Sequence, residues 1–177
     1  MRYFLNIFVF LFLAACSPTQ DFTELLGVQQ TNQIKVSRDN PVYEAIQYIH
    51  FNERTHRAEL KELTGVDPVR TEWCAAFVNS VLEESGIPSN KDHAYPLTAR
   101  SFLDWGSSVD KPQSGDIVIF PRGRKGWQGH VGFFVKEEII NGVKYYYILG
   151  GNQSNKVSIE LYRANKALGI RRATIDI

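Results

Sequence analysis

The hydrophobic pattern divides the chain into three parts. Residues 4–13 form an apolar run that is interrupted only by Asn6. In residues 40–106, apolar positions recur every three or four residues, which is the spacing of amphipathic helices. From residue 112 onward, short apolar runs alternate with turn residues, which is typical of β-strands. Helices followed by strands predict an α+β fold.

Four helices are expected in the first of these structured parts. They cover about residues 41–49, 57–64, 71–85 and 97–105. The first begins with Asn40, a capping residue, and Pro41, whose ring suits the first helical position. In the third, Phe77 and Val81 lie four residues apart, so one side of that helix can be buried. Thr71 is expected to cap its N-terminus.

Five strands are expected in the second structured part, arranged as an antiparallel meander. They cover about residues 117–120, 130–135, 144–149, 157–161 and 170–175. Asn141 and Gly142 stand between the second and third strands, and this pair is the strongest short signal for a tight hairpin. The sheet is expected to pack against the helix at residues 71–85.

The N-terminal apolar run is typical of a secretory signal rather than of a folded domain. Arg2 precedes it, and the run is too short to span a membrane as a helix. Residues 13–16, with the sequence Leu-Ala-Ala-Cys, resemble the bacterial lipobox. That resemblance implies that residues 1–15 are removed as a lipoprotein signal peptide and that Cys16 is lipidated, with palmitate among its acyl chains. An ordinary signal peptide followed by an unrelated cysteine is the alternative.

The lipobox also implies a location. Two or three acyl chains hold a protein firmly on a membrane. Ser17 follows the cysteine, where an aspartate would favour the inner membrane. The resemblance therefore implies the outer membrane of a bacterial envelope, with the protein facing the periplasm. Residues 16–40 are then expected to form a polar tether, and residues 41–177 the folded domain.

Charge and cysteine content narrow the possible functions. The sequence has 20 Lys and Arg against 19 Asp and Glu, without a basic cluster, so nucleic acid is not an expected partner. It contains 2 cysteines. If Cys16 carries lipid, Cys74 has no partner for a disulfide and no second cysteine for a metal site. The chemistry expected of Cys74 needs neither a metal nor an organic cofactor.

Cys74 is the leading candidate for a reactive group. It lies in the first turn of its predicted helix, and the positive end of a helix lowers a thiol pKa from its free value of about 8.5. His130 opens a strand directly after Gly129, which places a candidate base at the edge of the sheet. The alternative is that Cys74 is a small buried hydrophobe, as most free cysteines are.

A third polar group should orient the His130 ring, as in other thiol hydrolases. The end of one antiparallel strand lies beside the start of its neighbour, so Asn152 is the first choice and Gln153 the second. The backbone N–H of Cys74 is expected to bind the oxyanion together with one further, unidentified donor. Substrate-binding candidates are Arg100 and Trp127, for which a solvated surface position is the alternative.

Five motifs follow one another along about residues 70–177. They are residues 73–78 around Cys74, residues 99–106, Gly115-Asp116, Gly129-His130 and residues 149–153. Together they resemble the NlpC-type and CHAP (cysteine, histidine-dependent amidohydrolase/peptidase) cell-wall hydrolases. The resemblance implies a papain-like fold, with Cys74 as nucleophile, His130 as base and Asn152 as third catalytic residue. Trp73 departs from the NlpC-type pattern, which has an aspartate there, and glycines precede Asn152.

The expected function is that of a lipoprotein cell-wall hydrolase. By resemblance it would cut amide bonds of peptidoglycan stem peptides, or the bond between muramic acid and alanine, through a cysteine acyl-enzyme. Its partners would be peptidoglycan and, through Cys16, a membrane. A non-catalytic, lipid-anchored adaptor that binds peptidoglycan is the alternative, and an acyl transferase that uses the same thiol is a third hypothesis.

Overall fold

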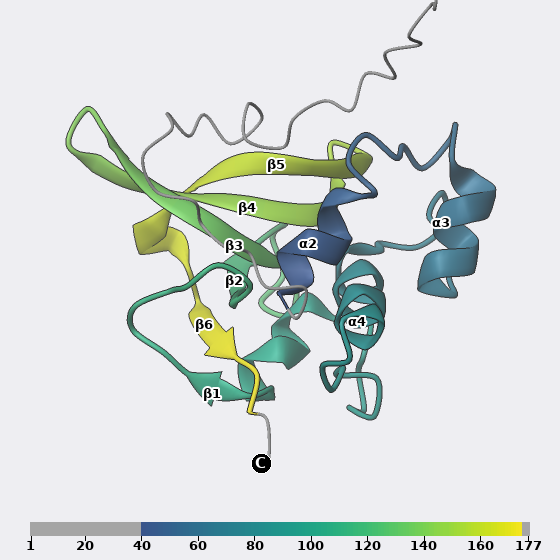
Figure 1. The fold of residues 1–177 in the computed structure, drawn as a ribbon, viewed down its shortest axis with the longest axis horizontal. Helices are drawn as coiled ribbons and strands as arrows, with labels where there is room; N and C mark the ends of the chain where they lie inside the picture. The colour runs from purple at the N-terminus through teal and green to yellow at the C-terminus, as the bar shows by residue number, and fades with distance from the viewer. Residues whose placement is uncertain (1–39, 175–177) are drawn as a thin grey trace, which may run out of the picture. The chain divides into compact units, whose positions relative to one another are not determined.

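The computed structural model describes residues 40–174. The predicted signal peptide, Cys16 and the tether before Asn40 lie outside the described residues. The elements within them are α2 (Pro41–Ile46), α3 (Arg57–Thr64), α4 (Cys74–Glu84), the 3₁₀ helix η1 (Ala99–Asp104), β1 (Ser107–Ser108), β2 (Ile117–Pro121), β3 (Gly129–Ile140), β4 (Val143–Gln153), β5 (Lys156–Arg163), the 3₁₀ helix η2 (Ala164–Lys166) and β6 (Gly169–Arg172). Helices precede a sheet, so the predicted α+β class is confirmed (Figure 1).

The strands form one antiparallel sheet in the order β1-β6-β2-β3-β4-β5. The predicted meander holds from β2 to β5, but it is wrong for the last strand, because β6 crosses the sheet and lies between β1 and β2 (Figure 1). Arg172 of β6 explains this placement. Its Nε and Nη2 donate to the two carboxylate oxygens of the buried Asp116 at 2.8 and 2.7 Å, just before β2. A buried carboxylate needs such a partner.

The hairpin between β3 and β4 is confirmed at the predicted residues. Ile140 pairs with Val143, and Asn141 and Gly142 between them have φ of 50° and 76°. Both angles are positive, as a two-residue hairpin turn requires. The hairpin fixes the register that brings the end of β4 beside the start of β3, where the candidate site residues lie.

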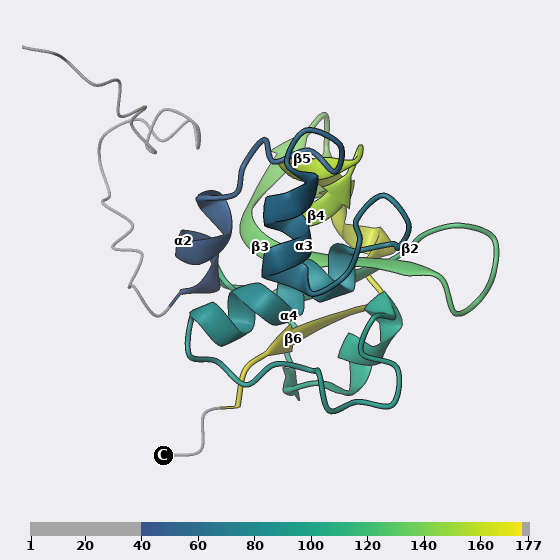
Figure 2. The same ribbon diagram turned by 90° about the vertical axis from the view of Figure 1, so that its right-hand side faces the viewer.

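Helix α4 is the central helix of the domain. It packs on β3 and β4, while α2 and α3 pack on it (Figure 2). All of its residues from Cys74 to Leu82 are buried. The sequence indicated that one side of this helix can be buried. The structure buries more than one side, because neighbouring elements cover it.

Three helices differ from their predicted bounds, and the first of them, α2, ends at Ile46 and not at residue 49. Asn40 caps α2 as expected, accepting from the Val42 N–H at 2.9 Å. The predicted cap at Thr71 is wrong, because α4 begins at Cys74 and the Thr71 N–H donates to the Asp67 carbonyl in a preceding turn. The predicted helix at residues 97–105 is the shorter 3₁₀ helix η1.

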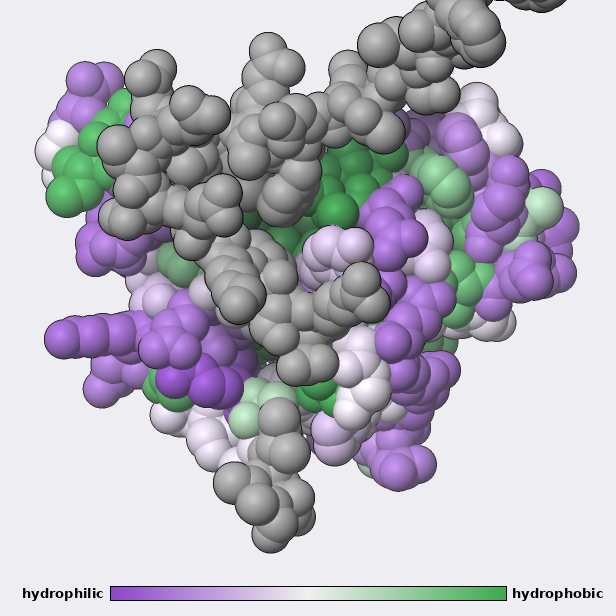
Figure 3. All heavy atoms as spheres, viewed as in Figure 1, coloured by the Kyte–Doolittle hydropathy of each residue, from purple (hydrophilic) through white to green (hydrophobic). Residues whose placement is uncertain are grey.

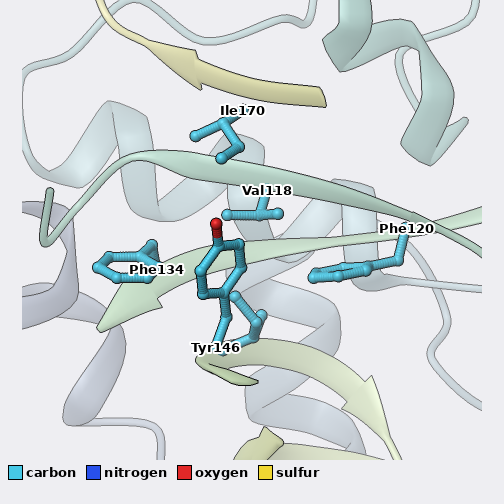
Figure 4. Packing of buried hydrophobic residues seen from close by; sticks show 6 residues of the cluster. Val118, Phe120, Phe134, Tyr146 and Ile170 are labelled. Atoms are coloured by element: carbon cyan, nitrogen blue, oxygen red, sulfur yellow. The ribbon is translucent and has the colours of Figure 1, made fainter. Parts of the chain in front are cut away.

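One apolar cluster consists of side chains from four strands of the sheet, β2, β3, β4 and β6. Its six buried residues are Val118, Phe120, Phe134, Tyr146, Ile148 and Ile170 (Figure 4). Tyr162 packs against this cluster, its ring 4.6 Å from that of Phe120. Tyr162 also stacks on the ring of His130. The cluster therefore supports this candidate site residue through Tyr162.

The outer surface is mainly hydrophilic along the edge formed by α3 (Figure 3). Leu60 and Thr64 of that helix are buried, whereas its charged residues are exposed. Between residues 40 and 174, no helix is both long and apolar enough to cross a bilayer.

Candidate active site

Cys74 is the first residue of α4 and is only 3% exposed. The backbone N–H groups of Val131 and Ala75 donate to its sulfur, so the thiol lies against the start of β3. Gly151 of β4 makes this close approach possible. A Cβ at Gly151 would lie 2.5 Å from the Trp73 ring and 2.7 Å from Phe77 Cβ, so only glycine lets β4 reach the beginning of α4.

The electrostatics of Cys74 differ from the sequence prediction. Burial raises the pKa of the thiol, and the charge of Glu72 acts in the same direction. The positive charge of Arg122 and the N–H groups at the sulfur lower the pKa but do not outweigh burial. The predicted lowering of the pKa is therefore wrong for the free protein, because desolvation penalises the thiolate more than the helix N-terminus stabilises it.

His130 lies on β3 and is 1% exposed. Its Nε2 is 3.0 Å from Gln153 Oε1. The Gln153 amide nitrogen donates to the carbonyls of Ser158 at 2.6 Å and Ile148 at 3.2 Å, which fixes which end of the amide faces the ring. Because Gln153 presents an oxygen, Nε2 must carry the proton, and Nδ1 is left with a free lone pair.

The second nitrogen of the ring is available for chemistry. Nδ1 is buried and has no hydrogen-bond partner among the described residues, Cys74 included. Tyr162 stacks on the ring with centroids 5.5 Å apart, which holds the imidazole in place. Burial, and then the charge of Arg122, lower the pKa of His130 to about 3, although the bond to Gln153 raises it. The imidazole is therefore neutral near pH 7 and can accept a proton at Nδ1.

The structure shows no hydrogen bond between Asn152 and His130, which differs from the first choice made from the sequence. It has a φ of 57°, and the register between β4 and β5 shifts between Gly150 and Gln153. This irregularity turns the side chain away. Its side-chain amide nitrogen donates to Glu72 at 2.6 Å, and its backbone carbonyl accepts from Arg122 at 3.1 Å. Gln153, the second choice, occupies the orienting position.

A groove of about 280 Å³ opens beside Cys74. Its lining includes Glu72, Arg122 and Trp127, and the two charged side chains approach each other to 3.9 Å. Trp127 is 62% exposed and lines this groove, so its ring is accessible from it. Arg100 lines a neighbouring hollow instead, and its Nε donates to the Gln128 carbonyl at 2.8 Å.

A known protein family matches the part of the chain that contains this site. Residues 66–152 match the model of the CHAP domain family, as the resemblance implied. The chain carries a CHAP domain. CHAP domains are generally hydrolases that act on peptidoglycan. No curated protein matches the sequence.

The CHAP match includes Cys74, His130 and Asn152 but ends one residue before Gln153. Gln153 and Tyr162, which hold the His130 ring, therefore lie beyond the matched segment. Tyr162 was not expected at the site, because a tyrosine on an alternating strand carries no sequence signal of a site.

Two charged residues of the CHAP domain were also not recognised as neighbours of Cys74. These residues are Glu72 and Arg122. Both line the groove, and their positions depend on the fold rather than on spacing. No group of three or more His, Cys, Asp or Glu side chains that could hold a metal ion occurs within residues 40–174.

Proposed function

We propose that this CHAP domain is a cysteine-dependent hydrolase that cuts amide bonds of peptidoglycan stem peptides. The observation that carries the proposal is the fixed Gln153 amide. It accepts from Nε2 of His130, so that the lone pair of the base is at Nδ1. A neutral, oriented imidazole beside the start of β3, where Val131 contacts the Cys74 sulfur, is the arrangement that a thiol nucleophile needs.

Acylation would begin when a substrate carbonyl enters the groove. Nδ1 of His130 takes the thiol proton as the Cys74 sulfur attacks the carbonyl carbon. The backbone N–H of Cys74 at the start of α4 stabilises the oxyanion, and the nearby charge of Arg122 favours the negative charge that develops. The carbon–nitrogen bond then breaks, the amine leaves with the proton from Nδ1, and a thioester remains on Cys74.

Deacylation reverses the roles of the same groups. A water molecule attacks the thioester carbonyl while Nδ1 of His130 takes one of its protons. The carbon–sulfur bond breaks, the carboxylic acid leaves, and the proton returns to the Cys74 sulfur. In the free protein the pair is uncharged, because burial raises the pKa of the thiol and lowers that of His130. Proton transfer therefore accompanies attack, and the hydrogen bond between them forms in the substrate complex.

We also propose that the protein is a lipoprotein of the outer membrane. The support is the lipobox-like sequence at residues 13–16 and Ser17 after it. In this proposal Cys16 carries the acyl chains and peptidoglycan in the periplasm is the substrate. The two cysteines then have separate tasks, Cys16 in anchoring and Cys74 in catalysis.

The decisive experiment incubates the purified protein with peptidoglycan sacculi and analyses soluble products by mass spectrometry. We expect the wild type to release muropeptide fragments and Cys74→Ala to release none. Cys16→Ala is the matched control. It should keep hydrolysis in solution and lose incorporation of radiolabelled palmitate in cells, whereas Cys74→Ala should keep the label. Equal release by the wild type and Cys74→Ala would refute the mechanism.

A non-catalytic, peptidoglycan-binding adaptor is the second candidate. The observation that favours it is the burial of Cys74 together with the raised pKa of its thiol. An adaptor would bind sacculi and release no fragments, so the same incubation separates the two functions. Slow alkylation of the free thiol does not separate them, because both predict it.

A further inference from the structure

A second hollow, of about 450 Å³, lies next to the Cys74 groove. Thr98 and Trp127 line both, so the two spaces adjoin at these side chains. Tyr95, Arg100 and Asp104 line only the second one. The mechanism proposed above uses none of these three residues.

Two exposed aromatic rings border this hollow. Tyr95 is 70% exposed and Trp127 is 62% exposed, and they come from different loops. Large rings left in water beside a concave surface mark a binding site more often than isolated surface residues do. Their faces offer a flat apolar surface whose shape is fixed by few rotatable bonds.

Each ring stands on a loop that hydrogen bonds hold in place. The Tyr95 N–H donates to Nδ1 of His93 at 3.0 Å, and His93 Nε2 lies 3.7 Å from Asp104. On the other side, Arg100 donates to the carbonyl of Gln128, the residue after Trp127. The hollow is thus largely formed before any ligand arrives, as ligand sites usually are.

The lining combines these rings with a few polar groups. Nε of Arg100 is engaged by Gln128, and the guanidinium carries further N–H donors that can reach a ligand. The hydroxyl of Thr98 and the carboxylate of Asp104 add an acceptor each. A pyranose ring has an apolar C–H face and a rim of hydroxyl, amide and carbonyl groups, which matches this combination of faces and donors.

We infer that this hollow binds an amino sugar of the peptidoglycan glycan strand and thereby selects the bond that is cut. The second part rests on the proposed function. An extended residue spans at most about 3.3–3.6 Å, and the two spaces share Thr98 and Trp127. Because the two spaces adjoin, a sugar in the hollow favours an amide bond near the glycan end of its own stem peptide at Cys74 over a cross-link farther along.

Binding tests the sugar site without any catalysis. Isothermal titration of the purified protein with a linear tetramer of N-acetylglucosamine should give saturable binding. Tyr95→Ala should weaken it about tenfold, as expected for losing one stacked ring. Tyr43→Ala, a change at an exposed tyrosine on α2, is the matched control and should bind like the wild type. Cys74→Ala should also bind like the wild type.

The outcomes separate this inference from the proposed function. Absence of binding by the wild type, or equal binding by Tyr95→Ala and Tyr43→Ala, would overturn the sugar site. Products from sacculi test the bond. Fragments cut at the muramic acid–alanine bond or the next one support the inference, and exclusive cutting of cross-links overturns it while leaving the thiol mechanism intact. If Cys74→Ala still cuts but Tyr95→Ala loses binding, the proposed mechanism fails and the sugar site stands.

Discussion

At the scale of single residues, the site depends on an amide whose two ends are distinguishable. Gln153 donates to two backbone carbonyls and accepts from His130, so it determines which imidazole nitrogen carries the proton. A hydroxyl or a freely rotating amide in its place would permit either tautomer. In the proposed mechanism Gln153 is therefore a positioning residue, which acts on substrate only through His130.

We expect Gln153→Ala to lower kcat by about 10- to 100-fold with little change in KM, because a misoriented base loses part of the gain from general base catalysis. Asn152→Ala leaves the bond between Gln153 and His130 in place, so its kcat should fall less. Gln153→Glu supplies a negative charge at Nε2 and should raise the pKa of His130, moving the acid limb of the kcat/KM profile upward. An unchanged acid limb in Gln153→Glu would show that Gln153 has only a structural role.

The sequence indicated Cys74 and His130 as candidate site residues. It could not decide whether Asn152 or Gln153 contacts the His130 ring. The first two are marked by a predicted helix start and a strand start, and these signals are local. The choice between neighbouring residues depends on which face of β4 each occupies. Strand alternation would decide this, but the register shift after Gly150 breaks the alternation at that point.

At the scale of elements, the site depends on how closely the end of β4 approaches the start of α4. Gly151 lies against Trp73 and Phe77 at this contact. The sequence analysis placed the helix start three residues too early, because Thr71 is a good capping residue and Trp73 is a poor one. The chain instead buries Trp73 at the N-terminal end of α4, so tertiary packing overrides the local capping preference.

We expect Gly151→Ala to destabilise the fold by about 1–3 kcal/mol, the usual cost of overpacking. Its new Cβ would lie 2.5 Å from the Trp73 ring, and one of the two elements would have to move. Gly126→Ala is the matched control, because a Cβ there meets no atom within 4 Å. Urea unfolding midpoints measure both. Equal midpoints for the two variants would mean that β4 does not restrain α4.

At the scale of the whole molecule, the fold keeps an uncharged histidine in its interior. His130 is 1% exposed. Its ring stacks on Tyr162, which in turn packs against the apolar cluster. The α+β class and most of the sheet could be predicted from the spacing of apolar residues, because the buried positions of a helix or strand recur with its period. The crossing of β6 to β2 could not, because it depends on the pairing of Arg172 with Asp116, which are far apart in the chain.

The buried imidazole makes stability depend on pH. Its pKa is about 3 in the folded state and about 6.5 when unfolded, so between these values the unfolded chain binds the extra proton. Stability is then fully present above about pH 6.5 and is lost as pH falls toward 3. Between pH 7 and pH 5 this group alone should lower the free energy of unfolding by about 2 kcal/mol.

Urea unfolding at pH 7 and pH 5 measures this change. His130→Gln removes the titrating group and should show a pH 7 to pH 5 loss about 2 kcal/mol smaller than the wild type, even if the variant is less stable at both pH values. His50→Asn changes an exposed histidine and should keep the wild-type loss. The subtraction cancels the contribution of the carboxylates, which titrate in all three proteins. An identical loss in His130→Gln and the wild type would mean that folding does not lower the pKa of His130, contrary to this prediction.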